Sequence, residues 1–382
     1  MLGLLLQYSQ VYRKGFCVSI RTSLVDLTSR LVAIPSVSAE KRDLQPVIDL
    51  VVAELADYPA ALLHHRDANV YPMLVVNFNQ ELRSDLILNA HLDVVPARPE
   101  QWQAFERDGK LYGRGTQDMK GSAAVYIEII KEIAQLPAAQ RPSVSFQFVT
   151  DEEIGGANGT ALLRDEGWQA NLFIAGEPTN LNICHGAKGI LWLAVEQPGV
   201  PAHGSRPWEG VNPIERLASG LGRLYDYYPT PAQEIWRTTV TPAIIKGGDA
   251  GNRIPANAQL NLDIRWTPEE GADAVIDNVK QAFATTSEPN PNVQILHRGT
   301  ALNTPAEEPN LQRIVDAQQT SLGRQAQLFR EHFGSDARFY SDAGIPAVCW
   351  GPEGAGLHTD DEWVSIDGLV NYYQAVKALL GM

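Results

Sequence analysis

The stretch from Asp85 to Pro96 constrains the fold most, because an apolar segment there ends in two residues with chemical function. Leu86–Asn89 has the composition of a buried strand, and the proline stops the pattern. His91 and Asp93 are two residues apart, so their side chains point the same way in an extended chain. Open α/β sheets place their sites at the carboxyl ends of strands. We therefore expect an α/β fold with a functional site where this strand ends. The alternative for this pair is a structural role, with a hydrogen-bonded histidine at the strand end and an aspartate that caps the backbone.

The length of the chain favours two domains, and its charge and apolar runs argue against nucleic acid and membranes as partners. A chain of 382 residues is too long for one ordinary core. The net charge of −14 argues against nucleic acid or an anionic membrane as the main partner. The apolar runs are also much shorter than the ~20 residues of a membrane-spanning helix. We expect neither nucleic-acid binding nor membrane insertion.

The cysteines and the N-terminus bear on the cellular compartment. Cys17, Cys184 and Cys349 are odd in number and lack metal-type spacing, so we expect thiols in a reducing cytoplasm. Residues 1–20 are expected to be a disordered extension, because the apolar run Leu2–Leu6 is shorter than the core of a signal peptide. A translation start near Val18 is a hypothesis that the intact mass of the native protein would test.

Helical and strand patterns alternate along the first half of the chain. Apolar spacing predicts helices over residues 22–33, 44–57 and 121–133, and strands over 73–77, 86–89, 143–150 and 172–175. This alternation favours a mixed, largely parallel sheet flanked by helices.

The pattern changes near Lys188 and changes back after Thr300. Between them, strands are predicted over residues 191–196, 239–246, 258–266 and 293–297, and helices over 212–227 and 272–283. Two strand–helix–strand units of this kind indicate a small inserted α+β domain. Beyond it we predict a helix over 311–322, a strand over 347–350 and a final helix over 366–380. The catalytic domain is therefore expected to be discontinuous, residues 21–188 and 300–382, around an insert of residues 189–299.

Acids and histidines stand at the predicted strand ends or beside glycine-rich turns. They are His91, Asp93, Asp118, Glu152, Glu153, Glu177 and His358. Each alone has an ordinary alternative, such as a helix cap or a solvated acidic turn. Together, in a chain with eight histidines, they favour a functional site.

The residue types of this set suit metal ions. Two histidines with Asp118, Glu153 and Glu177 offer nitrogen and oxygen ligands for two divalent ions, with zinc as the first choice. The positive charge of the ions exceeds the negative charge of the three carboxylates. Such a site lowers the pKa of a bound water, and Glu152 can then accept the proton.

These residues lie in ordered motifs that are specific. The motifs are His91-Leu-Asp93-Val-Val-Pro, Gly113-Arg-Gly-Thr-Gln-Asp118-Met-Lys-Gly, Thr150-Asp-Glu152-Glu153, Gly176-Glu177-Pro-Thr and the His358 loop. Over nearly all of residues 20–380 the sequence resembles the acetylornithine deacetylase and succinyl-diaminopimelate desuccinylase family of dinuclear zinc deacylases. Carboxypeptidases, dipeptidases and aminoacylases are related to that family. One departure, Gln117 before the aspartate, is not expected to affect metal binding.

The resemblance implies how the metal ligands are shared between two ions. Asp118 would bridge the ions, His91 and Glu177 would hold one, and Glu153 and His358 would hold the other. Zinc is the ion implied, with cobalt and manganese as alternatives.

The resemblance also implies roles outside the ligand set. Asp93 would orient the first histidine ligand, and Glu152 would be the general base. In the insert, His203 would reach the active site of the partner subunit in a homodimer formed through residues 189–299. Asn252 and Arg265 would hold the carboxylate of the substrate. An insert that serves dimerisation alone is the alternative.

We therefore expect a cytoplasmic metal-dependent hydrolase that cleaves the amide bond of N-acyl amino acids or short peptides. A metal-bound hydroxide would attack the carbonyl, with Glu152 transferring the proton and His203 helping to stabilise the oxyanion. A carboxypeptidase or dipeptidase with the same centre is the alternative among enzymes. A non-catalytic binding protein of the same fold is a remote alternative, because such a protein is expected to lose a metal ligand or the general base, and this sequence keeps them all. A dinucleotide site is rejected, because Asp118 stands where the third glycine of that loop would be.

Overall fold

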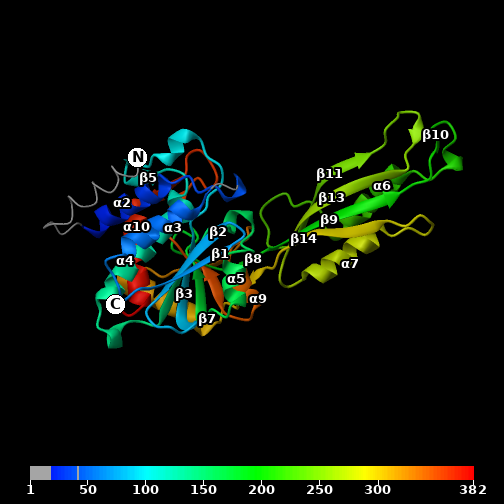
Figure 1. The fold of residues 1–382 in the computed structure, drawn as a ribbon. Helices are drawn as coiled ribbons and strands as arrows, with labels where there is room; N and C mark the ends of the chain where they lie inside the picture. The colour runs from blue at the N-terminus through cyan, green and yellow to red at the C-terminus, as the bar shows by residue number, and fades with distance from the viewer. Residues whose placement is uncertain (1–18, 41–42) are drawn as a thin grey trace. The chain divides into compact units, whose positions relative to one another are not determined.

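The computed structural model describes residues 19–40 and 43–382, which form two compact units. The first unit holds the described residues up to Ile183 together with Glu307–Gln327 and Cys349–Met382. The second holds Cys184–Ala306 and Leu328–Val348 (Figure 1). Residues 1–18 of the predicted N-terminal extension lie outside the described residues. The limits of the insert, residues 189 and 299, stay a prediction.

A nine-stranded mixed sheet confirms the predicted α/β class. Its strands are β1 (Leu62–Ala68), β2 (Tyr71–Asn77), β3 (Arg83–His91), β6 (Val144–Val149), β7 (Gln169–Ala175), β8 (Ile183–Ala187), β15 (Leu302–Asn303), β16 (Leu328–Glu331) and β17 (Ala347–Cys349). The order is β1-β2-β6-β3-β7-β17-β8-β15, and β16 also pairs with β8. β3 is parallel to both of its neighbours, β6 and β7, whereas β2 is antiparallel to β6 and to β1.

The central strand β3 is buried on both faces. Leu86, Ile87 and Leu88 are at most 1% exposed. Because consecutive strand residues point to opposite faces of a sheet, this burial means that both faces are covered there. The strand therefore holds the backbone at its carboxyl end, where His91 lies, in a fixed place.

The predicted helices of the first unit are present with small changes at their ends. They are α2 (Ile20–Val32), α3 (Gln45–Leu55), α4 (Gly121–Gln135), α8 (Pro309–Leu322) and α10 (Ile366–Leu379), and the short helix α5 (Thr160–Asp165) accompanies them. The sequence pattern gave α4 one apolar face, yet Ala123, Val125 and Tyr126 are fully buried too. The reason is that α2, α3 and α10 all pack against α4. The short helix α9 (Ala337–Asp342) was not predicted.

A small second sheet positions two of the functional loops, and the sequence did not reveal it. Its strands are β4 (Phe105–Arg107), β5 (Lys110–Tyr112), β18 (Gly354–Ala355) and β19 (Trp363–Ser365), in the order β18-β19-β5-β4. Tyr112 on β5 is paired with Trp363 on β19. β5 leads directly into the loop with Asp118, and β18 and β19 flank the loop with His358.

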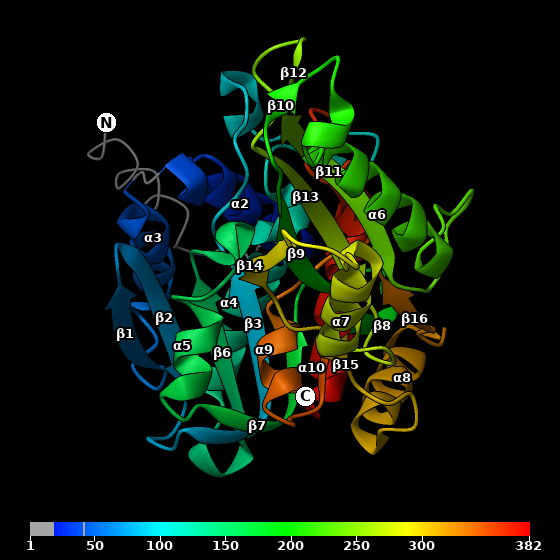
Figure 2. The ribbon, with the colours of Figure 1, turned by 90° about the vertical axis from the view of Figure 1, so that its right-hand side faces the viewer.

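The second unit contains a four-stranded antiparallel sheet with the order β11-β13-β9-β14. Its strands are β9 (Gly189–Pro198), β11 (Thr239–Gly247), β13 (Asn257–Trp266) and β14 (Asn292–Arg298). Helices α6 (Pro213–Tyr227) and α7 (Ala272–Phe283) cover one face (Figure 2). Alternate residues of β13, from Ala258 to Ile264, join the core beneath these helices. A separate pair of short strands joins β10 (Ala202–His203) to β12 (Arg253–Ile254).

In the part of the chain that the structure describes, none of the helices combines the length and apolar character of a membrane span.

Candidate metal centre

His91 is the last residue of β3 and is held with its ring almost completely buried. The side chain is 1% exposed. Its Nδ1 lies 2.9 Å from the backbone carbonyl oxygen of Asp93. This contact fixes the ring orientation and directs Nε2 towards the carboxylates of Asp118 and Glu177.

Asp118 lies on the loop between β5 and α4 and faces both histidines of the predicted set. Its Oδ1 is 2.9 Å from Nε2 of His91, and its Oδ2 is 3.2 Å from Nε2 of His358. The loop turns at Gly115, whose φ is +83° and where a Cβ would lie 2.7 Å from Val94 Cγ1. Glycine is therefore required for the turn that brings the aspartate between the two rings.

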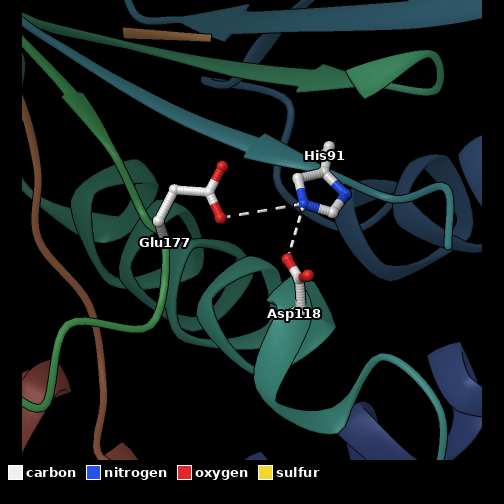
Figure 3. Close-up of side chains that lie close together, drawn as sticks. All are labelled: His91, Asp118 and Glu177. Atoms are coloured by element: carbon white, nitrogen blue, oxygen red, sulfur yellow. Dashed lines mark hydrogen bonds and ion pairs between the residues drawn. The ribbon is translucent and has the colours of Figure 1, made fainter. Parts of the chain in front are cut away.

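Glu177 follows β7 and completes a first group with His91 and Asp118. Its Oε2 lies 3.9 Å from Nε2 of His91. Figure 3 shows this ring nitrogen facing both carboxylates. The preceding Gly176 is packed so closely that a Cβ would lie 2.8 Å from atoms of Met119 and of two other side chains. The strand end is therefore pressed against the start of α4.

Glu153 and His358 complete a second group that shares Asp118 with the first. Glu153 lies in the turn after β6, and its Oε2 is 3.3 Å from Nε2 of His358. The His358 side chain is 50% exposed, whereas that of Glu153 is 8% exposed. His358 has a φ of +59°, an unusual backbone conformation for a residue other than glycine.

The electrostatics of the cluster favour positive charge. Burial lowers the pKa of the His91 imidazole, but the nearby carboxylates, chiefly Asp118, outweigh it and leave that pKa well above its ordinary value. Contacts with Asp118 and Glu153 raise the pKa of His358 to about 10. Burial raises the pKa of the Asp118 carboxyl, yet the two histidines lower it more, so the net shift is downward. A cluster that attracts protons in this way also attracts a cation.

The donor set fits divalent metal ions. One ligand atom from each of His91, Asp118 and Glu177 lies within 4.8 Å of the others, and the same holds for Asp118, Glu153 and His358. Imidazole nitrogen and carboxylate oxygen are donors that zinc and similar ions accept. The structure thus brings together all the residues that the sequence analysis assigned as metal ligands.

Asp93 contacts His91 differently from the expected carboxylate–imidazole pair. The nearest carboxylate oxygen, Oδ1, is 3.7 Å from Nδ1 of His91, and the ring is instead held by the Asp93 carbonyl. The carboxylate accepts hydrogen bonds from the backbone N–H groups of Glu152, at 3.2 Å, and Glu153, at 3.1 Å. Ser38 donates a further hydrogen bond at 2.7 Å. The Asp93 side chain therefore organises the turn of the two glutamates.

The three residues predicted from the insert lie in the second unit. His203 is paired with Arg253 across the β10–β12 strands, and the Asn252 carbonyl accepts the N–H of Gly204 at 2.7 Å. His203 and Asn252 are thus near one another in the chain fold. Arg265 lies on β13, where its Nε and Nη2 donate to Asp263 at 3.0 and 3.3 Å. Their reach towards a substrate stays a prediction.

The sequence analysis did not single out several residues that support the cluster. Arg114 and Glu362 form a buried pair beside Asp118. The ammonium group of Lys120, which is fully buried, donates to the carbonyls of Leu31 at 3.0 Å and Ile34 at 2.9 Å. Arg114 and Lys120 lie inside the motif that contains Asp118, and this position was the sequence feature that could have pointed to their supporting role.

Comparison with known proteins connects this arrangement to a family. The profile of a family described as Peptidase family M20/M25/M40 matches residues 87–381. The chain is 28% identical over 375 residues to a putative succinyl-diaminopimelate desuccinylase DapE of Mycobacterium tuberculosis, with 95% of this chain and 99% of the relative aligned. It is 29% identical over 370 residues to an acetylornithine deacetylase of Edwardsiella ictaluri, with 91% and 94% aligned. The resemblance found from the motifs is thereby confirmed.

A solved structure shares the fold. The crystal structure of aminopeptidase PepT from Bacillus cereus matches with a TM-score of 0.78 at 20% identity, covering 94% of this chain and 98% of that chain.

Proposed function

Because the chain belongs to the peptidase family M20/M25/M40 and is a metallohydrolase of amide or peptide bonds, we propose that it deacylates N-acyl amino acids with two divalent ions held around Asp118. The observation that carries this proposal is the shared carboxylate: each Asp118 oxygen faces a different histidine, at 2.9 and 3.2 Å. One group would hold an ion with His91 and Glu177, the other with Glu153 and His358. Zinc is the proposed ion, with cobalt and manganese as alternatives.

When bound, such ions polarise a carbonyl and acidify water. The chain's own contribution would be proton transfer and orientation. We assign the general base to Glu152, which would take a proton from the attacking water and deliver it to the leaving amine. Its backbone N–H is fixed by Asp93, next to the proposed ligand Glu153.

The choice of deacylation over peptide cleavage is supported by the names of the curated relatives, a putative desuccinylase and a deacetylase, which align over most of both chains. A carboxypeptidase or dipeptidase remains the alternative function. In either case we propose that Asn252 and Arg265 hold the free carboxylate of the substrate, because a guanidinium can donate two parallel hydrogen bonds to it. The substrate would then compete with Asp263 for Arg265.

We further propose a homodimer formed through residues 189–299, with His203 reaching the active site of the partner subunit. Support comes from the edge strand β11, where Ile244 is 49% exposed and Ile245 63% exposed. An edge strand with unpaired backbone groups and exposed apolar residues is suited to pairing with another copy. Mixing inactive His203→Ala with inactive Glu152→Ala protein should restore part of the activity, since one site of the mixed dimer has both residues intact. No recovery after verified subunit exchange would contradict this role of His203.

A cytoplasmic location is also proposed. It is supported by the thiol of Cys184, which is buried and donates to the Gly186 carbonyl instead of forming a disulfide, as suits a reducing compartment.

The proposed function is tested by metal analysis together with a substrate screen. Protein purified without chelator and reconstituted with zinc should hold about two equivalents of metal per chain and release acetyl or succinyl groups from N-acyl amino acids. A metal content near zero would contradict the proposal. Hydrolysis of dipeptides without deacylation would favour the alternative function.

A further inference from the structure

We propose that Arg114 and Glu362 are positioning residues of the metal centre, which hold the loop with Asp118 and the loop with His358 in a fixed position relative to one another. The inference rests on the proposed function, because it concerns the ligands of the proposed ions. Nη1 of Arg114 lies 2.5 Å from Oε2 of Glu362, and the two side chains are 4% and 1% exposed.

Glu362 fixes the backbone at Asp118. Its Oε1 accepts the backbone N–H groups of Gln117, at 3.0 Å, and of Asp118 itself, at 3.2 Å. A carboxylate can accept two adjacent N–H groups with one oxygen and bind a guanidinium with the other. The direction in which the Asp118 side chain leaves the backbone therefore depends on Glu362.

Arg114 fixes the backbone next to His358. Its Nη2 donates to the carbonyl oxygen of Thr359 at 3.0 Å, and Nε2 of Gln101 donates to the same oxygen at 3.2 Å. Gln101 also donates to the carbonyl of Asp360 at 3.4 Å. Because the left-handed conformation of His358 is unfavourable for a residue with a Cβ, it persists only where neighbouring groups hold it.

Stability alone is a weak reason for this pair. Two charges lose their hydration when they are buried, and apolar residues of similar size often serve stability equally well. What apolar residues cannot supply is an acceptor for the backbone N–H groups of Gln117 and Asp118 and a donor for the carbonyl of Thr359.

The same loop offers a matched control. Arg98 and Asp360 form a second ion pair, 2.9 Å long, between the segment before β4 and the His358 loop. Their side chains are 63% and 57% exposed, so water and salt screen the pair. It contacts none of the backbone groups that Arg114 and Glu362 hold.

The test uses the full chain with the substitutions Glu362→Gln, the pair Arg114→Met with Glu362→Leu, and the control Asp360→Asn. Zn²⁺ affinity is measured by competition with a chelator, the coordination geometry by the visible absorption of the Co²⁺-loaded protein, and stability by thermal unfolding without metal. We expect the apolar double variant to stay folded but to unfold at a somewhat lower temperature, because backbone groups lose their partners, and to bind Zn²⁺ about 10–100-fold more weakly, with an altered Co²⁺ spectrum. The control should match the wild type in all three measurements.

Unchanged affinity and spectrum in the double variant would overturn the inference and leave the pair a purely structural role. Glu362→Gln provides the same test with the side-chain volume preserved, since its amide cannot serve the guanidinium and both N–H groups as a carboxylate does. The inference predicts weaker Zn²⁺ binding in this variant as well, and wild-type affinity would overturn it. A wild-type chain that binds no divalent ion would contradict the proposed function itself.

Discussion

The carboxylate of Asp93 holds the backbone of Glu153, whose N–H donates to Oδ2 at 3.1 Å. The other oxygen accepts the N–H of Glu152 at 3.2 Å, and the Asp93 carbonyl faces the His91 ring. Asp93 thus connects the end of β3 to the turn after β6. Through these contacts it positions His91 and Glu153, one proposed ligand of each ion, and the proposed base Glu152.

Asp93→Asn should weaken metal binding about 10–100-fold, the range for residues that orient ligands. The new amide nitrogen would face one of the two backbone N–H groups, so a donor would meet a donor. Chelator competition measures the loss. Ser38→Ala is the control, because it removes only the hydroxyl donor to Asp93 and should have a smaller effect. Wild-type affinity in Asp93→Asn would show that the turn keeps its place without the carboxylate.

Glu152→Ala should lower turnover about 10²–10⁴-fold, the usual contribution of a general base, while the metal content stays unchanged. Glu153→Ala should instead lose metal, because this carboxylate lies 3.3 Å from the His358 ring. Turnover and metal content are measured on both variants. The opposite pattern would show that the roles of the two neighbours are exchanged.

Gly176→Ala should destabilise the protein by about 1–3 kcal/mol, as overpacking does in a dense core. The added methyl group would lie 2.8 Å from Met119 Cε, Ser122 Cβ and Tyr126 Oη. Gly222→Ala is the matched control, because its methyl group would meet nothing within 4 Å and the position is inside α6. We expect this control to be stabilised by roughly 0.5–1 kcal/mol. Denaturant unfolding compares the two; equal stabilities would contradict the close packing at Gly176.

Glu54→Gln should destabilise the protein by about 1–3 kcal/mol at neutral pH, since it breaks charge-assisted hydrogen bonds. Lys131 and Arg30 each donate to this carboxylate at 2.7 Å. Burial raises the pKa of the Glu54 carboxyl, but these cations lower it more, so the pKa lies below its ordinary value of 4.5.

The sign of this shift sets the pH dependence. The stabilisation from ionised Glu54 is full above the ordinary pKa and is lost as the pH falls through the lower pKa of the folded state. The difference between wild type and Glu54→Gln should therefore shrink in acid. Thermal unfolding of both proteins between neutral and acidic pH measures it, and a difference that grows towards acid would contradict the assigned shift.

The ligand cluster could be predicted from the sequence because its members follow strands that the sheet aligns. His91 ends β3 and Glu177 follows β7, two parallel neighbours whose carboxyl ends share one edge of the sheet. Local patterns therefore carried most of the information about these positions.

The supporting contacts could not be predicted, because they join distant segments. Arg114 and Glu362 are 248 residues apart, and strands as short as β18 and β19 show no periodicity. The spacing of His91 and Asp93 suggested a contact between their side chains. The Asp93 carboxylate instead accepts a backbone N–H in a turn 59 residues further along the chain. The polar edge strand β1 was missed because half-exposed residues such as His64 and Arg66 break the apolar pattern.

The shared position of Asp118 has a consequence for the order in which the centre can form during synthesis. His91, Asp118 and Glu177 all belong to the first half of the chain, so the three ligands of this group are made early, whereas Glu362, which fixes the Asp118 backbone, is made late. The group with Glu153 must wait for His358, which emerges only after the whole second unit has been translated. A nascent chain therefore carries all three ligands of the first group, and two of the second, long before His358 and Glu362 can complete and fix the centre.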